Sequence, residues 1–320
     1  MTTKLDYDSP HYVTANGVRF AVYEAGPENG PPIILCHGWP ELAYSWKHIV
    51  PALAGAGYRV IAPDMKGFGR TDGPLDPAAY NMDVLTADFD ALMAEMGLKD
   101  AIFLGHDWGG AFVWPMAYRY PTRVRAVASI CTPHVKRAPV SPLSIFEKRT
   151  SDRHYIIQFQ DPALPDKVFG GREEAFAEFI FRKPAPRAAW PKLMPQALFL
   201  PDNFARFEKT DDTKLVMPRA DLKVFSDMYK KTGFQAGTNY YRAIDKNWAL
   251  TEGIDLTVHQ PSLMIGAELD MMLPPEQMDG METLCPDLEK KVLKDCGHWA
   301  MWEQPTAINA ILTDWLARRF

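Results

Sequence analysis

The sequence predicts an α/β fold, with a mostly parallel central sheet, helices on both faces and a helical segment inserted into it. Short apolar runs alternate with helical patterns through the first 130 residues, which is typical of parallel strands joined by helices. After Cys131 the pattern changes, and prolines interrupt short aromatic-rich stretches. The alternation returns near residue 250. We therefore expect a core formed by 1–132 and 251–320, with a helical cap at 133–250.

The core begins with a predicted hairpin. Residues 13–16 and 18–24 alternate in polarity on either side of Asn16-Gly17, a strong signal for a two-residue turn. Apolar runs then predict strands at 33–36, 58–62, 101–104, 124–130, 262–265 and 288–293. Apolar residues at helical spacing predict helices around 46–53, 82–96, 111–120 and 300–319. A glycine-punctuated loop at 64–71 separates the first two of these helices.

Composition limits the classes of function. The chain has 320 residues, 47% of them hydrophobic, and a formal net charge of -5, which suits one large globular unit. Acids and bases are mixed along the chain, without the basic stripe that binds nucleic acid. No apolar run is long enough to span a membrane, and residues 1–10 lack the core of a signal peptide. We expect a cytoplasmic protein without a nucleic-acid partner or membrane insertion.

The cysteines give no sign of a metal centre or a disulfide framework. Cys36, Cys131, Cys285 and Cys296 show neither C-x-x-C spacing nor a metal-ligand pattern. In a cytoplasmic protein such thiols stay reduced, so we expect four unpaired, buried cysteines. The sequence leaves the monomer and the homodimer open.

The motif that organises the predicted chemistry is Gly105-His106-Asp107-Trp108-Gly109-Gly110, between a strand and a helix. Strand, tight turn and helix form the context of a nucleophile elbow, whose strained turn lifts one side chain above the sheet. Its glycines leave room for that turn. The raised residue is Asp107 rather than a serine, and a carboxylate is already an anion that can attack carbon directly. The alternative is a helix N-cap, where aspartate is also favoured.

Two further residues complete a predicted triad. His298 follows Gly297 in the loop after the last strand, where the base belongs in the order nucleophile, acid, histidine. Asp270 lies in the loop after the 262–265 strand, the position of the acid, with Glu268 as a close competitor. We expect His298 to be the base and Asp270 to orient it.

Two other histidines lie near these motifs, and we expect a structural role for each. His37 comes too early in the chain to be the base of this arrangement. His106 precedes the nucleophile, but strand alternation turns its side chain the other way.

A second loop is expected to supply an oxyanion hole. His37-Gly38-Trp39-Pro40 follows the 33–36 strand. We expect the backbone N–H groups of Trp39 and Trp108 to converge on one oxygen, as beside a nucleophile elbow. The Trp39–Pro40 bond is a candidate for the cis form, because such bonds occur in tight turns.

With these motifs, the chain resembles the soluble epoxide hydrolases of the α/β-hydrolase superfamily over nearly its whole length. The elbow, the 37–40 motif and Gly297-His298 are similar to motifs of the haloalkane dehalogenases, so they do not decide the activity. The insertion decides the activity, because two of its segments resemble the lid segments that carry the epoxide hydrolase tyrosines. These segments are 155–162, and 239–243 with Asn247-Trp248. By that match the pair is Tyr155 and Tyr241. Lys66 departs from the family's usual Arg, without an expected effect on catalysis.

The resemblance implies that water converts a small apolar epoxide to a vicinal diol, without a metal or an organic cofactor. Asp107 would form a hydroxyalkyl ester while Tyr155 and Tyr241 protonate the epoxide oxygen. His298, oriented by Asp270, would then activate the water that releases the diol. Residue chemistry agrees with this, since tyrosine hydroxyls are neutral donors that suit an apolar pocket. The alternative for both tyrosines is aromatic core packing.

Two other functions remain open from the sequence. A dehalogenase would use the same Asp107 ester but stabilise a halide, usually with indole N–H groups. Trp108 offers one such group, but no lid tryptophan partner is evident, and halide release would identify this activity. A non-catalytic binding protein of the same fold would keep a pocket and lose the triad, whereas this chain retains it together with both tyrosines.

Overall fold

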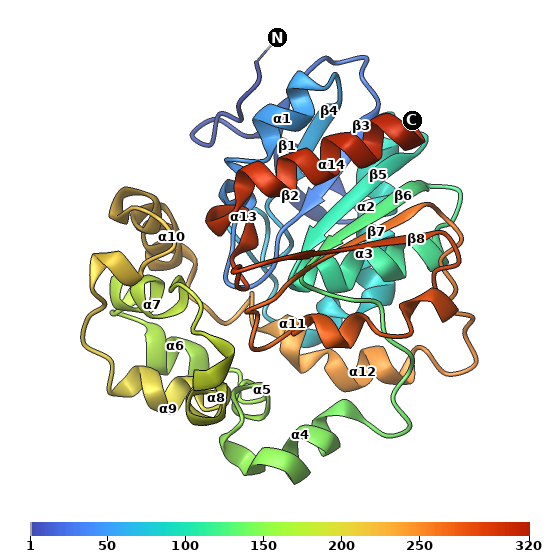
Figure 1. Ribbon diagram of the computed structural model, residues 1–320. Coiled ribbons are helices and arrows are strands. Elements are labelled where there is room, and N and C mark those ends of the chain that lie inside the picture. Colours follow the sequence, from blue (N-terminus) through green and yellow to red (C-terminus); the bar gives the residue numbers. More distant parts are fainter. Residues whose placement is uncertain (1) are drawn as a thin grey trace.

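The computed structural model describes residues 2–320, so Met1, the first residue of the predicted core segment 1–132, lies outside the described residues. An eight-stranded sheet runs through the core in the order β1-β2-β4-β3-β5-β6-β7-β8 (Figure 1). The pairs β1–β2 and β2–β4 are antiparallel, and the other pairs are parallel. The strands are β1 (His11–Ala15), β2 (Val18–Ala25), β3 (Pro32–Cys36), β4 (Arg59–Pro63), β5 (Ala101–His106), β6 (Val124–Ile130), β7 (Ser262–Ala267) and β8 (Leu288–Leu293).

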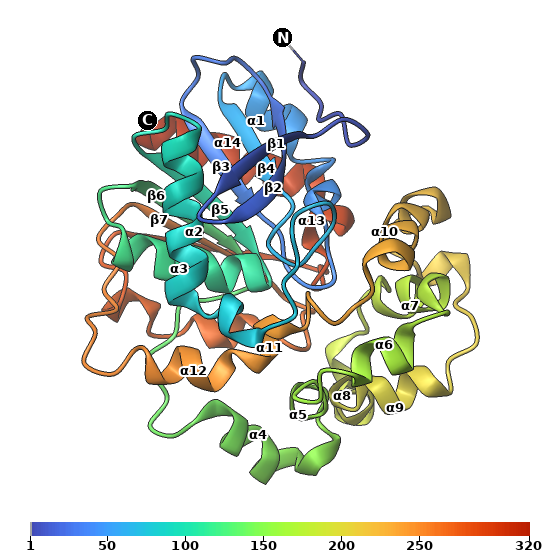
Figure 2. The same ribbon diagram turned by 180° about the vertical axis from the view of Figure 1, so that it is seen from behind.

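Helices cover both faces of this sheet. They are α1 (Val50–Gly55), α2 (Met82–Glu95), α3 (Trp108–Arg119), α13 (Ala300–Glu303) and α14 (Pro305–Arg319). Figures 1 and 2 show α1 and α14 on one face and α2 and α3 on the other. Buried Trp46 and Trp315 belong to the apolar cluster of the first face, and Phe89 and Phe112 to that of the second. The predicted α/β architecture is confirmed.

Between β6 and β7 the chain is helical. Figure 1 shows α4 to α10 on one side of the molecule, apart from the helices that cover the sheet. The helices of this segment are α4 (Pro142–Thr150), α5 (Tyr155–Gln158), α6 (Leu164–Phe169), α7 (Glu173–Ile180), α8 (Trp190–Leu198), α9 (Leu200–Ala205), α10 (Arg219–Thr232), α11 (Asn239–Arg242) and α12 (Ile244–Ala249). Within the part of the chain that the structure describes, no helix is both long and apolar enough to cross a membrane.

Local sequence signals account for several boundaries. At the β1–β2 turn, Asn16 and Gly17 have φ values of 49° and 78°, as a type I′ turn requires. The Asn81 side chain caps α2 by accepting a hydrogen bond from the backbone N–H of Val84 at 3.2 Å. Beyond the C-terminus of α2, Gly97 has a φ of 68°, which glycine adopts without a steric penalty.

Three helix predictions need correction. The helix expected at 300–319 is divided into α13 and α14, because Pro305 lacks an N–H and disfavours helical geometry at Gln304. The helical stretch around 46–53 is divided into a 3-10 turn, Ala43–Trp46, and the short helix α1. The helix expected at 111–120 begins earlier, at Trp108, directly after the elbow.

A buried ion pair holds the loop after β4 against α2. The Lys66 ammonium lies 2.6 Å from the Asp88 carboxylate, and the two side chains are 4% and 1% exposed. Lys66 also donates to the carbonyl of Ala79 at 3.1 Å, and the Asn16 amide donates to Asp88 at 2.7 Å. Lys66 therefore has a defined, buried partner in Asp88.

Removing one member of this pair should be costly, because the other charge stays buried and uncompensated. We expect Lys66→Met to lower the free energy of unfolding by about 3–5 kcal/mol, measured by urea denaturation. The double variant Lys66→Met with Asp88→Leu should recover much of that loss. Lys223→Met, which breaks the exposed pair with Asp227, is the control and should cost less than about 1 kcal/mol. Equal effects of the two single variants would contradict this view.

Candidate active site

Asp107 occupies a strained turn between β5 and α3. Its φ is 51° and its ψ is -121°, a conformation that costs energy for any residue with a Cβ atom. The turn is tight, because a Cβ atom on Gly105 would lie 2.2 Å from the carbonyl oxygen of Gly109. Although Asp107 immediately precedes α3, its side chain makes no capping hydrogen bond to that helix. The carboxylate therefore does not act as an N-cap.

The loop after β3 contacts the Asp107 carboxylate instead. The backbone N–H of Trp39 donates to Asp107 Oδ1 at 2.7 Å, and the Trp39–Pro40 peptide is cis, as expected. A Cβ atom on Gly38 would lie 2.4 Å from the same oxygen, so only glycine allows this approach. Trp108 is the first residue of α3, and its share in an oxyanion hole stays a prediction.

The structure brings His298 and Asp270 together beside Asp107. His298 Nδ1 lies 2.7 Å from Asp270 Oδ2, and His298 Nε2 lies 3.6 Å from Asp107 Oδ2. The other oxygen of Asp270 accepts from the backbone N–H groups of Met272 and Leu273 at 3.0 and 2.9 Å. The competing Glu268 pairs with Lys294 at 2.9 Å instead. Of the two candidates for the acid, Asp270 is the one that contacts His298.

The pKa values of His298 and Asp270 depend on burial and on the charges around them. Burial opposes a positive charge on His298, but Asp270 and Asp107 outweigh it and raise the pKa of His298 well above its usual value. Burial acts to raise the pKa of Asp270, but the charge and hydrogen bond of His298 lower it below its usual value. Asp270 thus favours the protonated form of His298, and His298 favours the ionised form of Asp270.

Tyr155 and Tyr241 meet at this site, although they lie on α5 and α11. Their ring centroids are 5.6 Å apart, at an interplanar angle of 78°. The Tyr241 ring is also 5.1 Å from that of Trp108 and 5.6 Å from that of Trp39. Burial raises the pKa of both tyrosines, and so does the negative charge of Asp107. Both hydroxyl groups therefore remain protonated at neutral pH and can donate.

His37 and His106 have their ring nitrogens occupied, in agreement with structural roles. His37 Nε2 accepts from the backbone N–H of Met65 at 2.9 Å, and its Nδ1 lies 2.9 Å from the carbonyl oxygen of Gly38. His106 Nδ1 lies 2.7 Å from Glu41 Oε2, and its Nε2 donates to the carbonyl of His298 at 2.8 Å. Burial opposes a charge on His106, but Glu41 outweighs it and raises the pKa of His106 to about 10.

Sequence reasoning missed two glutamates that hold the loops of this site. Glu41 is fully buried, and its Oε2 also accepts from the backbone N–H of Gly38 at 2.8 Å. Through His106 it links the loop of Trp39 to the loop of His298. Glu303 accepts from the N–H groups of Gly297 and Trp299 at 2.7 and 3.1 Å. The only sequence signal was the position of each glutamate close to a predicted loop.

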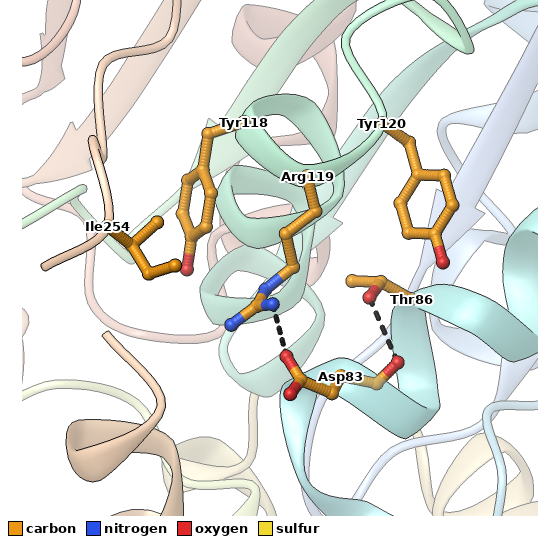
Figure 3. Close-up of a pocket in the computed structure, with 6 residues that line it drawn as sticks. All are labelled: Asp83, Thr86, Tyr118, Arg119, Tyr120 and Ile254. Atoms are coloured by element: carbon orange, nitrogen blue, oxygen red, sulfur yellow. Dashed lines mark hydrogen bonds and ion pairs between the residues drawn. The ribbon is translucent and has the colours of Figure 1, made fainter. Parts of the chain in front are cut away.

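A surface pocket lies away from these residues. It has a volume of about 340 Å³ and is lined by Asp83, Thr86, Tyr118, Arg119, Tyr120 and Ile254. Figure 3 shows the ion pair of Arg119 with Asp83 inside it. None of the predicted site residues lines this pocket, so it is separate from the candidate active site.

Comparison with known proteins gives the family of the chain. Residues 31–305 match the alpha/beta hydrolase fold family. Epoxide hydrolase A of Mycobacterium tuberculosis is 35% identical over 311 residues, which cover 95% of this chain and 96% of that protein. Bifunctional epoxide hydrolase 2 of Sus scrofa is 36% identical over 94% of this chain. The chain covers 53% of this relative and so spans about half of its length.

Solved structures give the same result. The crystal structure of epoxide hydrolase A from Mycobacterium thermoresistibile has a TM-score of 0.88 and 34% identity, covering 97% of this chain and 98% of that chain. The epoxide hydrolase VrEH1 from Vigna radiata has a TM-score of 0.84 and 26% identity. The fold is that of an α/β-hydrolase. Within that class, the chain belongs to the epoxide hydrolase family.

Proposed function

We propose that the protein hydrolyses small apolar epoxides to vicinal diols through a covalent ester on Asp107. The observation that supports this most is the contact between Tyr155 and Tyr241, whose pKa values are both raised in part by the charge of Asp107. A carboxylate beside two protonated tyrosines suits a three-membered ring that must be attacked at carbon and protonated at oxygen.

In the first step, Asp107 attacks one epoxide carbon from the side opposite the C–O bond that breaks. Oδ1 is already bound by the Trp39 N–H at 2.7 Å, so Oδ2 is the oxygen free to attack. A new C–O bond forms, the epoxide C–O bond breaks, and Tyr155 or Tyr241 gives its proton to the departing oxygen. The product is a hydroxyalkyl ester of Asp107.

In the second step, His298 acts as a base on water. Esterification converts the Asp107 carboxylate to an ester, and the side-chain interaction of that carboxylate with His298 is one of the contributions that raise the pKa of His298. The imidazole can then return a proton to the tyrosine and take one from water at Nε2, while Asp270 holds Nδ1. The hydroxide attacks the carboxyl carbon, and the N–H groups of Trp39 and Trp108 stabilise the oxyanion. When the ester C–O bond breaks, the departing oxygen takes the proton of the newly formed carboxyl group, so the diol leaves and Asp107 is again a carboxylate.

The helical segment 133–250 acts in this proposal as a lid over the core formed by 1–132 and 251–320. It brings Tyr155 and Tyr241 together and adds apolar surface, since the Phe159 ring lies 5.5 Å from Trp39 and 5.3 Å from Tyr241. An apolar surrounding of this kind favours apolar epoxides. A cytoplasmic location belongs to the same proposal, supported by four buried cysteines that are all free thiols.

Two tryptophans of the lid argue against a dehalogenase. The indole N–H of Trp190 donates to the carbonyl of Ala185 at 3.1 Å, and that of Trp248 to the carbonyl of Ala138 at 2.8 Å. Neither N–H group is free to bind a halide beside Asp107. Diol formation from a chromogenic epoxide, without halide release from chlorinated alkanes, is therefore the expected activity.

The role of His298 predicts that its removal separates the two steps. Because alkylation needs no histidine, we expect His298→Gln to react once with an epoxide and to retain the ester. Intact-protein mass spectrometry should then show one added substrate mass, and peptide mapping should place it on Asp107. A variant that stays unmodified while it turns over at the normal rate would refute this role.

The role of the tyrosines predicts an effect on alkylation. Each single variant, Tyr155→Phe or Tyr241→Phe, should slow the step modestly, because one donor partly replaces the other. The double variant should lose about 10²–10⁴-fold, measured by rapid mixing. Tyr240→Phe is the matched control, since its hydroxyl donates to the carbonyl of Lys66 at 3.1 Å, and its rate should not change. Wild-type alkylation by the folded double variant would assign both tyrosines to packing alone.

A further inference from the structure

Cys131 and two histidines form a cluster directly beside the proposed base. Cys131 follows β6, and its Sγ lies 3.5 Å from the carbonyl oxygen of His298. His106 Nε2 lies 2.8 Å from that same oxygen. One potential ligand atom from each of Cys131, His106 and His298 lies within 4.8 Å of the other two. A thiol and two imidazoles therefore converge on a small volume.

The position of the thiol is fixed by its backbone. Cys131 has a φ of 65°, in the left-handed region that residues with a Cβ atom seldom adopt. Its N–H donates to the carbonyl of Ile265 at 2.8 Å, and the neighbouring Thr132 hydroxyl donates to the carbonyl of Asp107 at 2.9 Å. The side chain is held within the structure, with 1% of the residue exposed.

Carboxylates orient both imidazoles in this cluster. Glu41 Oε2 lies 2.7 Å from His106 Nδ1, and Asp270 Oδ2 lies 2.7 Å from His298 Nδ1. Carboxylate–histidine pairs of this kind fix the ring and increase its basicity in metal sites. Glu41, Asp270 and Asp107 place three carboxylates around the two imidazoles, and their charges favour a cation that replaces the imidazole protons.

We propose that Cys131, His106 and His298 form an inhibitory site for a thiophilic divalent cation of the Zn²⁺ or Cd²⁺ class. Sulfur and imidazole nitrogen are the ligands such ions prefer, at about 2.0–2.3 Å. Binding breaks the S–H bond and the N–H bond of each coordinating ring nitrogen, and at His106 Nε2 the metal bond replaces the hydrogen bond to the carbonyl of His298. It releases those protons to water and forms one metal–sulfur and two metal–nitrogen bonds.

His298 is the partly exposed member of this cluster. The side chains of His298 and Asp107 are 20% and 17% exposed, whereas His106 and Cys131 are 0% and 1% exposed. An ion that takes either ring nitrogen of His298 removes the base or frees it from Asp270. This consequence rests on the proposed function. Since alkylation needs no histidine, the ion should stop the reaction after the ester has formed.

Metal binding can be measured without any epoxide. Equilibrium dialysis of the full chain with Zn²⁺ should give one ion per chain, and Cd²⁺ should produce a thiolate-to-metal absorption band. Cys131→Ala should lose both signals. Cys131→Ser should lose them too, which would show that the loss in the alanine variant does not come from a packing defect. Cys285→Ala, which removes another buried free thiol, is the control and should keep both. Equal binding by the wild type and both Cys131 variants would overturn the site, as would a wild type that binds no ion.

Inhibition is tested separately on the active enzyme. Zn²⁺ should inhibit the wild type reversibly, with a chelator restoring turnover, and mass spectrometry should show the ester on Asp107 while the ion is bound. Cys131→Ala should need at least about 10-fold more Zn²⁺ for the same inhibition. Equal sensitivity of the two proteins would refute an inhibitory role for this site. If the protein opened no epoxide at all, the dialysis result would still decide whether the site exists.

Discussion

The strained backbone of Asp107 is the constraint on which the rest of the site depends. A φ of 51° between β5 and α3 places the carboxylate above the sheet rather than on the helix, where it would act as a cap. The turn is possible because Gly105 and Gly109 let three backbone segments pack closely. The hydrogen bond from Trp39 to Oδ1 then fixes the orientation of the carboxylate and leaves Oδ2 facing His298.

Buried charges connect the loops around this carboxylate. Glu41 binds both the N–H of Gly38 and the imidazole of His106, and His106 binds the carbonyl of His298. The loop that contacts Asp107 and the loop that carries His298 are therefore joined through one buried ion pair. These hydrogen bonds connect residues from separate strand ends and so help to hold them close to one another.

Local patterns predicted the fold and most of the candidate site. The hairpin at Asn16-Gly17, the strands, the elbow and the contact of His298 with Asp270 depend on short motifs or on the order of motifs along the chain. Pro305 marks the break between α13 and α14 in the sequence. The prediction of one helix at 300–319 followed the helical periodicity instead of this proline. Glu41 and Cys131 were not predicted to contact His106 or His298, because these residues come from different strand ends. The contacts of these residues depend on the order of the strands in the sheet and on backbone strain. Neither can be predicted from the spacing of residues along the chain.

The central claim is that Asp107 is a nucleophile rather than a general base. The most direct test is a single turnover in ¹⁸O-labelled water with the enzyme in excess over the epoxide. If the carboxylate attacks carbon, the diol oxygen that does not come from the epoxide comes from Asp107, and water replaces it there. We expect an unlabelled diol, with the label in the peptide that contains Asp107. A fully labelled diol with no label in that peptide would contradict the covalent mechanism.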